Sequence, residues 1–434
     1  MRKVILLITL GCISFSALPG QTQVRRYATQ QVDRQLRAQI PDLGKEKDQL
    51  ETTIKEFKLQ NKLDSYTIPV VFHIVYKKGQ IIPTIEQVLH QLESLNTDFQ
   101  SGNTVAKHLA DTREGFLRTS ASVNIRFCLA EPLYEKDKKT AIQFIETNAY
   151  EWKADDAIKL SEKGGADPWD TKKHLNIWVG YLSDGISGYA QFPGGPAETD
   201  GIVIDSRFFG VAGFAKAPYD GGKTLTHLAG NYLGLKDLWD EERPCGDDGV
   251  DDTPVHNAPN YGQPGYRHIS LCGNYPVEMT MNFMDNTDDA AQYMFTLGQK
   301  YRMQAVLSSK GPRAQLSENG TSCAKENELM QTYSLNGNAE NPISEEVIRQ
   351  WAIAAYPNPA GNEFHLEFFI PDGGEVKFVI YSALGEVMAS KTLQTSPGRT
   401  MENVNCKTWP PGVYFIHAVY HNQQTSSRIL LTKN

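Results

Sequence analysis

The stretch that most constrains the fold of this chain is residues 224–237, which read TLTHLAGNYLGLKD. His227 and Asn231 are four residues apart, so a helix would place them on one face, where both could reach a single ion. Gly234 can adopt the left-handed conformation that ends a helix, which lets Asp237 return toward the same point. The spacing therefore predicts a helix and a tight turn, in the three-ligand geometry of a catalytic zinc site with an open fourth position.

The residue types in this stretch do not supply the chemistry that the spacing suggests. Position 228, where a carboxylate would deprotonate a metal-bound water, is Leu228. Without a metal, His227 is a buried helical histidine with an ordinary hydrogen bond, and Asn231 and Asp237 cap or hydrogen-bond the end of the helix. Leu228 and Tyr232 are then packing residues. For the individual side chains we favour this structural interpretation over metal ligation.

The helix resembles the metzincin zinc helix, H-E-x-x-H-x-x-G-x-x-H, and further segments between about Ile68 and Met303 resemble the pappalysin family of metzincins. Together these segments are far more specific than the zinc motif alone. The resemblance implies an α+β fold, in which a metzincin-like domain with a mixed sheet carries the active-site helix. The segments begin at Trp178 (WVGYL), Gly188 (GYAQFPGGP), Thr199 (TDG), Cys245 (CGDDGVDDTP), Met281 (MNFMD) and Asp288 (DDAAQYMFT).

The resemblance also assigns roles to positions at which this chain departs from the family. His227, Asn231 and Asp237 stand at the three zinc-ligand positions. Only His227 is the family residue, although some metzincins use Asp in third place. Asn231 is a poor zinc ligand, because a neutral amide oxygen competes weakly with imidazole for a borderline-soft ion. Of the other family positions, only the methionine below the metal is kept, as Met284. Leu228 replaces the general-base glutamate, and Asn286 replaces the tyrosine that can stabilise the oxyanion. Tyr27 replaces the pro-peptide cysteine that caps the zinc.

These departures bear directly on catalysis. A general base contributes roughly 10²–10⁴-fold and an oxyanion donor roughly 10²–10³-fold, and a loose or absent metal also removes the activation of the water. We therefore expect little or no zinc and a catalytically inactive pseudo-protease. It would bind a peptide or protein along the strand near Gly188, as an extended substrate adds to a sheet edge.

The alternative function is an active metalloendopeptidase with an unusual metal site. In that interpretation His227 and Asp237 bind a metal weakly, together with the more distant His256 or His268.

An acidic turn follows the site and offers hard oxygen ligands on a glycine-containing loop, which suits calcium. Pappalysins bind calcium near this position. Structural calcium and a solvated acidic loop are equally good interpretations of the turn, whose candidate ligands are Asp247, Asp248, Asp251, Asp252 and Thr253.

Cysteine chemistry is not expected to carry the function. The chain after residue 20 has five cysteines, so at least one does not pair within the chain. The resemblance implies a disulfide between Cys245 and Cys272, worth roughly 3 kcal/mol. A second family disulfide is missing, with Tyr266 and Ala291 near the places of its cysteines. Cys128, in a predicted strand, is expected to be a buried thiol.

The two ends of the chain predict secretion. Residues 1–20 have the basic start, apolar stretch and small-residue end of a signal peptide. Residues 21–62 form a helical segment, interrupted at Pro41 and too poor in apolar residues for its own core, which resembles a pro-peptide. The metallopeptidase-like domain then spans 63–316, and a polar linker spans 317–350.

Short alternating strands separated by turns predict a β-sandwich over 351–434. Its segments YPNPA, IYSALG and PGVYF resemble the sorting domain of the type IX secretion system. The resemblance implies export across the outer membrane of a Gram-negative cell, to the surface or the medium, with the secretion machinery as a partner. The alternative is an ordinary accessory or carbohydrate-binding sandwich. The net charge of −8 argues against a nucleic-acid partner, and no apolar stretch is long enough to span a membrane.

Overall fold

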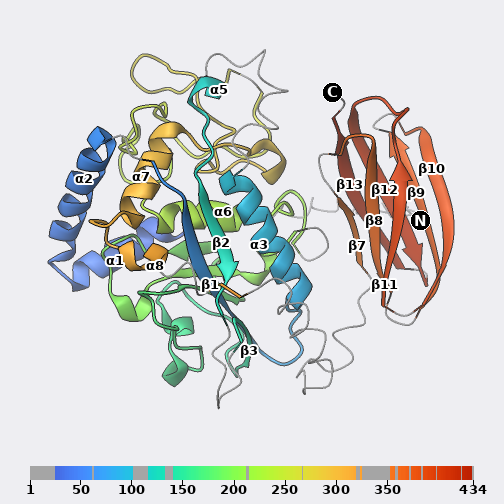
Figure 1. Cartoon of the computed structure of the whole chain (residues 1–434), viewed down its shortest axis with the longest axis horizontal. Coiled ribbons are helices and arrows are strands. Elements are labelled where there is room, and N and C mark those ends of the chain that lie inside the picture. The colour runs from blue at the N-terminus through green and yellow to red at the C-terminus, as the bar shows by residue number, and fades with distance from the viewer. Residues whose placement is uncertain are drawn as a thin grey trace, which may run out of the picture.

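The computed structural model of the chain describes most of its residues, in two bodies (Figure 1). The predicted signal peptide, and nearly all of the predicted linker, lie outside the described residues. These residues are 25–60, 63–100, 116–131, 140–211, 215–265, 267–318, 323–324, 352–356, 360–370, 373–382, 385–396, 398–421 and 423–432.

The larger body is built around a mixed six-stranded sheet in the order β2-β1-β4-β6-β5, with β3 also paired to β1. All neighbouring strands run parallel except β5, an edge strand antiparallel to β6. The predicted mixed sheet is therefore present, and strands lie where the β-branched runs near 66–76, 124–129 and 175–181 predict them. The strands are β1 (Tyr66–Tyr76), β2 (Ile125–Leu129), β3 (Ile142–Glu146), β4 (Leu175–Gly180), β5 (Gly188–Ala190) and β6 (Ile202–Asp205).

Helices pack around this sheet and bury their apolar faces on it. The helix from the zinc-type motif is α6, which contacts β5, β6 and α3. The α-helices are α1 (Thr29–Gln39), α2 (Leu43–Gln60), α3 (Ile85–Gln100), α5 (Phe116–Thr119), α6 (Lys223–Tyr232), α7 (Leu297–Leu307) and α8 (Ala314–Glu318). Short 3₁₀ turns are η2 (Ala157–Lys159), η3 (Ser161–Lys163), η4 (Ala197–Thr199), η5 (Ser206–Phe208) and η6 (Asp289–Ala291).

The N-terminal segment forms two helices, α1 and α2, separated near Pro41 as the proline predicts. Figure 1 shows α2 beside α7, and the two helices contact each other. The apolar residues of the segment join the core of the larger body, because they are too few to form one of their own. Those in the main core cluster are Tyr27, Leu50, Ile54 and Phe57.

The smaller body is a β-sandwich, as the alternating pattern predicts. One sheet has four strands in the order β10-β9-β12-β13, and the other has three in the order β11-β8-β7. Alternate residues of these strands face a separate hydrophobic core. The strands are β7 (Ala352–Tyr356), β8 (Glu363–Ile370), β9 (Gly374–Ser382), β10 (Val387–Thr395), β11 (Gly398–Asn405), β12 (Gly412–Tyr420) and β13 (Gln423–Leu431).

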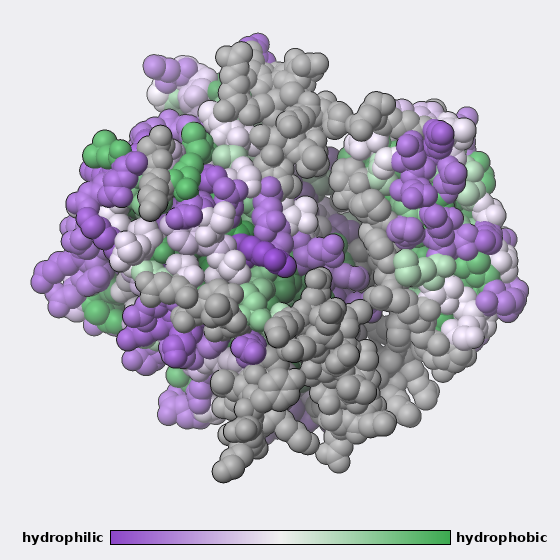
Figure 2. All heavy atoms as spheres, in the orientation of Figure 1, coloured by the Kyte–Doolittle hydropathy of each residue, from purple (hydrophilic) through white to green (hydrophobic). Residues whose placement is uncertain are grey.

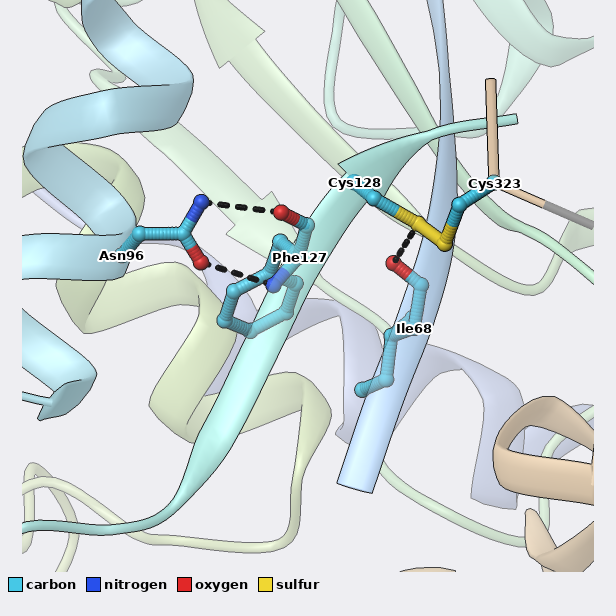
Figure 3. Close-up of a disulfide and its surroundings, with 5 residues drawn as sticks. All are labelled: Ile68, Asn96, Phe127, Cys128 and Cys323. Carbon is cyan, nitrogen blue, oxygen red and sulfur yellow. Dashed lines mark hydrogen bonds between the residues drawn. A yellow bond between two sulfur atoms is a disulfide. The ribbon is translucent and has the colours of Figure 1, made fainter. Parts of the chain in front are cut away.

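Two disulfides cross-link the larger body, and one corrects an expectation. Cys128 is not a buried thiol: it pairs with Cys323, with 5.7 Å between the Cα atoms (Figure 3). Ala324 N–H also donates to the carbonyl of Leu129, so the chain beyond α8 returns to β2. Cys245 and Cys272 form the second pair, which is the one that the family resemblance implies. Cys406 is a buried thiol in the sandwich.

The described part of the face drawn in Figure 2 carries mainly hydrophilic side chains, with smaller apolar patches between them. None of the described helices is both long and apolar enough to cross a membrane.

Candidate functional site: a metal-type motif covered by the N-terminal segment

Helix α6 begins and ends at glycines that adopt left-handed conformations. Gly222 precedes its first turn with φ +76°, and Gly234 follows its last turn with φ +88°. The Leu235 N–H then donates to the carbonyl of Gly230, at 2.9 Å, and so closes the helix end. Every residue of the helix after Lys223 is buried. The predicted helix and turn are therefore present.

The three ligand-type positions converge, as their spacing predicts. Nε2 of His227 lies 2.9 Å from Oδ1 of Asp237, and its Nδ1 lies 3.0 Å from the carbonyl oxygen of Phe283. The side-chain amide of Asn231 donates to the same Oδ1 of Asp237, at 3.1 Å, and to the carbonyl of Leu235. All three side chains are almost completely buried.

The donor chemistry of this group does not fit a catalytic zinc. The Nδ2 atom of Asn231 faces two acceptors, while its Oδ1 accepts from the hydroxyl of Thr29 at 2.9 Å. The amide therefore turns its N–H₂ toward Asp237, and an amide nitrogen that donates two hydrogen bonds has no lone pair for a metal. Imidazole and one carboxylate remain, which is one protein ligand fewer than catalytic zinc sites use. Among the described residues, no three His, Cys, Asp or Glu side chains are grouped to hold an ion.

The N-terminal segment covers His227, Asn231 and Asp237, with a different residue in contact with each. The ring of Tyr27 stacks on the imidazole of His227, with 3.7 Å between centroids and 8° between planes. Burial raises the pKa of the Tyr27 hydroxyl, so the ring is a neutral phenol. Besides the Thr29 contact with Asn231, the amide of Gln30 donates to Oδ2 of Asp237 at 3.0 Å.

The backbone of the same segment runs parallel to the edge strand β5 and adds to it. Tyr27 forms a bridge with Gly188, and Ala28 N–H donates to the Gly188 carbonyl at 3.0 Å. Ser187 N–H donates to the carbonyl of Arg26, and Arg26 N–H donates to the hydroxyl of Ser187. The strand near Gly188, which the sequence marks as a peptide-binding edge, is thus occupied by the chain's own residues.

Arg25 extends from this segment into a fully enclosed polar pocket. Its guanidinium is completely buried, pairs with Asp289 at 2.5 Å, and lies 4.8 Å from the ring centroid of Tyr219. Asn286 binds both ends of the residue: its Oδ1 accepts from Nε at 3.2 Å, and its Nδ2 donates to the Arg25 carbonyl at 2.9 Å. The pocket also supplies the carbonyl of Thr287 and the side chains of Thr224 and Gln292.

Arg25 and Asp289 form an ion pair in the cleft that the sequence analysis did not predict. Both lie in segments that resemble the family, and they carry opposite charges. Their opposite charges were the one sign in the sequence that they could pair. Because 264 residues separate them, nothing in the local pattern connects the two.

Two further family positions have packing roles. Leu228 is completely buried, and a methyl group at Gly188 would come within 2.6 Å of its Cδ1, so it fills the space directly beneath β5. The sulfur of Met284 packs against Gly230 in the same way, because a methyl group at Gly230 would come within 2.5 Å of it. The Tyr232 ring, also expected to pack, lies under the guanidinium of Arg313 at 3.6 Å.

The distant histidines have other partners. His256 Nε2 accepts from Met279 N–H at 2.9 Å, so its lone pair is engaged. The ring of His268 lies 3.6 Å from a carboxylate oxygen of Glu278.

The carboxylates of the acidic turn bind different partners instead of converging on one point. Burial raises the pKa of Asp248 to about 7, and its carboxylate accepts from Thr253 Oγ1 at 2.9 Å. Asp252 instead binds Thr296 and the N–H of Gly298. Asp247 accepts from Gly249 N–H, and exposed Asp251 pairs with Lys58. Calcium binding by this turn stays a prediction.

Comparisons with known proteins agree with the fold and with the family that the sequence resembles. Residues 160–308 match the family described as pregnancy-associated plasma protein-A, and residues 354–432 match the secretion system C-terminal sorting domain. The chain is 35% identical over 168 residues to an extracellular metalloprotease of Arthroderma benhamiae, covering 35% of this chain and 54% of that protein. The chain thus spans about half the length of the curated relatives it matches.

Two solved structures extend the likeness to more than half of this chain. Mature mirolysin of Tannerella forsythia, solved with a cleaved peptide, is 33% identical, with TM-score 0.56, over 61% of this chain and 100% of that one. A mutant of promirolysin from the same organism is 32% identical, with TM-score 0.61, over 70% of this chain and 99% of that one. The sorting domain and the extracellular relatives indicate a secreted or cell-surface protein. The chain belongs to the pregnancy-associated plasma protein-A, or pappalysin, family of metalloproteases.

Proposed function

We propose that this protein is a secreted pappalysin that does not hydrolyse peptides and acts by binding a peptide or protein. The observation that carries the proposal is the orientation of Asn231. Its amide N–H₂ faces Asp237, which leaves His227 and Asp237 as the only metal-type donors of the three. A hydrolytic zinc needs three protein ligands and an activated water.

The catalytic positions support the same conclusion independently of the metal. Leu228 has no group that accepts a proton, and it is packed beneath β5 rather than open to a substrate. Both polar atoms of the Asn286 side chain form hydrogen bonds with Arg25. Loss of the base would lower the rate roughly 10²–10⁴-fold, and loss of the oxyanion donor roughly 10²–10³-fold.

The cleft retains the features needed to hold an extended segment that carries an arginine. The edge of β5 offers backbone hydrogen bonds, and the pocket around Asp289 surrounds a guanidinium. In this chain Arg25 and its neighbours supply that segment. The type IX secretion machinery is the proposed partner of the sandwich, and calcium is the proposed ligand of the acidic turn.

An active peptidase with an unusual metal site is the second candidate. One observation favours it: the hydroxyl of Tyr27 is buried and has no hydrogen-bond partner among the described residues. A phenol oxygen in that position could serve as a further ligand beside His227 and Asp237.

Metal analysis of the purified full chain separates the two candidates. We expect well under one zinc per chain, and no chelator-sensitive cleavage of denatured protein. Stoichiometric zinc together with such cleavage would sink the proposal. Reversion of Leu228→Glu with Asn231→His is the informative variant, and we expect zinc binding to rise in it. His227→Ala is the control, because cleavage that survives loss of the remaining imidazole would place catalysis elsewhere in the chain.

A further inference from the structure

We infer that the N-terminal segment, residues 25–60, is a permanent part of the folded protein and not a removable pro-peptide. The degenerate metal site is its docking surface. Each of the three ligand-type residues has its own partner in the segment: Tyr27 stacks on His227, Thr29 donates to Asn231, and Gln30 donates to Asp237. The inference rests on the proposed function, since a protein that does not hydrolyse peptides needs no open cleft for a substrate. The peptide or protein that it binds would then contact a surface that the segment leaves free.

The buried ion pair of Arg25 opposes release of the segment. Asp289 is 3% exposed while Arg25 is in place, so release of the segment would break a buried ion pair and the hydrogen bonds around it. Water would have to replace each of these contacts before the segment could leave. The carboxylate of Asp289 also accepts from Gly221 N–H and Lys223 N–H, so it belongs to the start of α6 and cannot turn away freely.

The apolar contacts of the helices oppose release as well. Leu50, Ile54 and Phe57 of α2 are buried in the main core, beside residues of the sheet and α7. Val32 of α1 is buried in a second cluster that includes Trp178 and Tyr189. Release would expose both sets of side chains to water together with the surfaces that they cover.

A polar contact fixes α2 to the end of the motif helix. Arg302 of α7 donates to the carbonyl of Gly234, which ends the α6 turn, and pairs with Glu51 of α2. The side chain of Arg302 is 4% exposed. One residue therefore links the segment, α7 and the turn that positions Asp237.

Cleavage of the full chain at one engineered position tests this inference. A protease recognition sequence is inserted after Gln60, the exposed last residue of α2, and the purified protein is cut and passed through a gel-filtration column. We expect the cut segment to stay with the rest of the protein, and the midpoint of thermal unfolding to change by only a few degrees. Separation of the segment from a remainder that stays folded by circular dichroism would overturn the inference. Separation with unfolding of the remainder would support it.

Matched variants locate the contacts that hold the segment. Arg25→Met should increase the dissociation rate of the cut segment at least tenfold. Arg34→Met, on the exposed side of α1, should behave as the unsubstituted protein, because Arg34 makes only half-exposed ion pairs at 3.4 Å. Equal rates for the two variants would overturn the role of the buried pair. Zinc content and peptidase activity are measured on uncut protein, so a metal-loaded active enzyme that keeps its segment would refute the proposed function alone.

Discussion

At the scale of single residues, Asn231 and Arg25 explain how the N-terminal segment is held in the cleft. An imidazole and a carboxylate in contact need further hydrogen bonds when they are buried. Asn231 supplies one to Asp237 and anchors Thr29 of the segment. Arg25 supplies the charge that Asp289 needs in its enclosed pocket. Both residues therefore bind the N-terminal segment to the cleft through groups that would be costly to leave unpaired.

The Arg25–Asp289 pair allows a prediction by double-mutant cycle. Arg25→Met leaves a buried carboxylate without a partner and should lower the free energy of unfolding by about 3–5 kcal/mol. Asp289→Leu should have a cost of the same order. The double variant should cost clearly less than the sum of the singles, because neither charge is then left alone. Urea unfolding measures all four proteins. Additive costs would show that the two charges do not interact.

At the scale of elements, β1 carries a buried histidine that makes stability depend on pH. His73 is fully buried, its ring nitrogens lie 2.9 Å from Gln143 and Asn176, and burial lowers its pKa to about 4. The unfolded chain, with a histidine pKa near 6.5, binds a proton below that pH, whereas the folded chain does not. Stability is therefore fully present above about pH 6.5 and is lost as the pH falls toward 4.

The expected loss from this one residue is about 3 kcal/mol between pH 7 and pH 4, at about 1.4 kcal/mol per pH unit. His73→Gln should flatten the pH dependence of the free energy of unfolding by that amount. Unfolding in urea at several pH values measures the slope in His73→Gln and in the unsubstituted protein. An unchanged slope in His73→Gln would contradict the prediction.

The disulfide between β2 and the chain beyond α8 gives a second prediction at this scale. Cys128 and Cys323 are 195 residues apart, and their bond closes residues 128–323 of the larger body into one loop (Figure 3). Cys323→Ser should lower the free energy of unfolding by about 2–4 kcal/mol. Cys128→Ser with Cys323→Ser should cost no more than the single change, since one bond is lost in both. A further loss in the double variant would mean that the Cys128 side chain also contributes through packing.

The elements also separate what the sequence could predict from what it could not. Local patterns predicted β1, the α6 helix and its turn, because periodicity and Gly234 act over a few residues. The long-range pairs, Cys128 with Cys323 and Arg25 with Asp289, depend on how distant segments meet in space. Convergence of the three ligand-type residues followed from spacing, but the direction of the Asn231 amide did not.

At the scale of the whole molecule, the two bodies have separate hydrophobic cores. The larger core surrounds the mixed sheet, and the smaller one lies within the sandwich, with Ile380 completely buried in it. A unit with its own core can unfold by itself. The chain should therefore show two calorimetric transitions, and the free energies of unfolding predicted above for Arg25, His73 and Cys323 are those of the larger body.

Substitutions in each core test that independence. Ile380→Ala should destabilise the sandwich by about 2–5 kcal/mol and lower the temperature of only one transition. Ile177→Ala, at a fully buried position of β4, should lower only the other by a similar free energy. Scanning calorimetry measures both shifts in the full chain. If either substitution moved both transitions together, the sandwich and the larger body would unfold as one cooperative unit, because the stability of each would then depend on contact with the other.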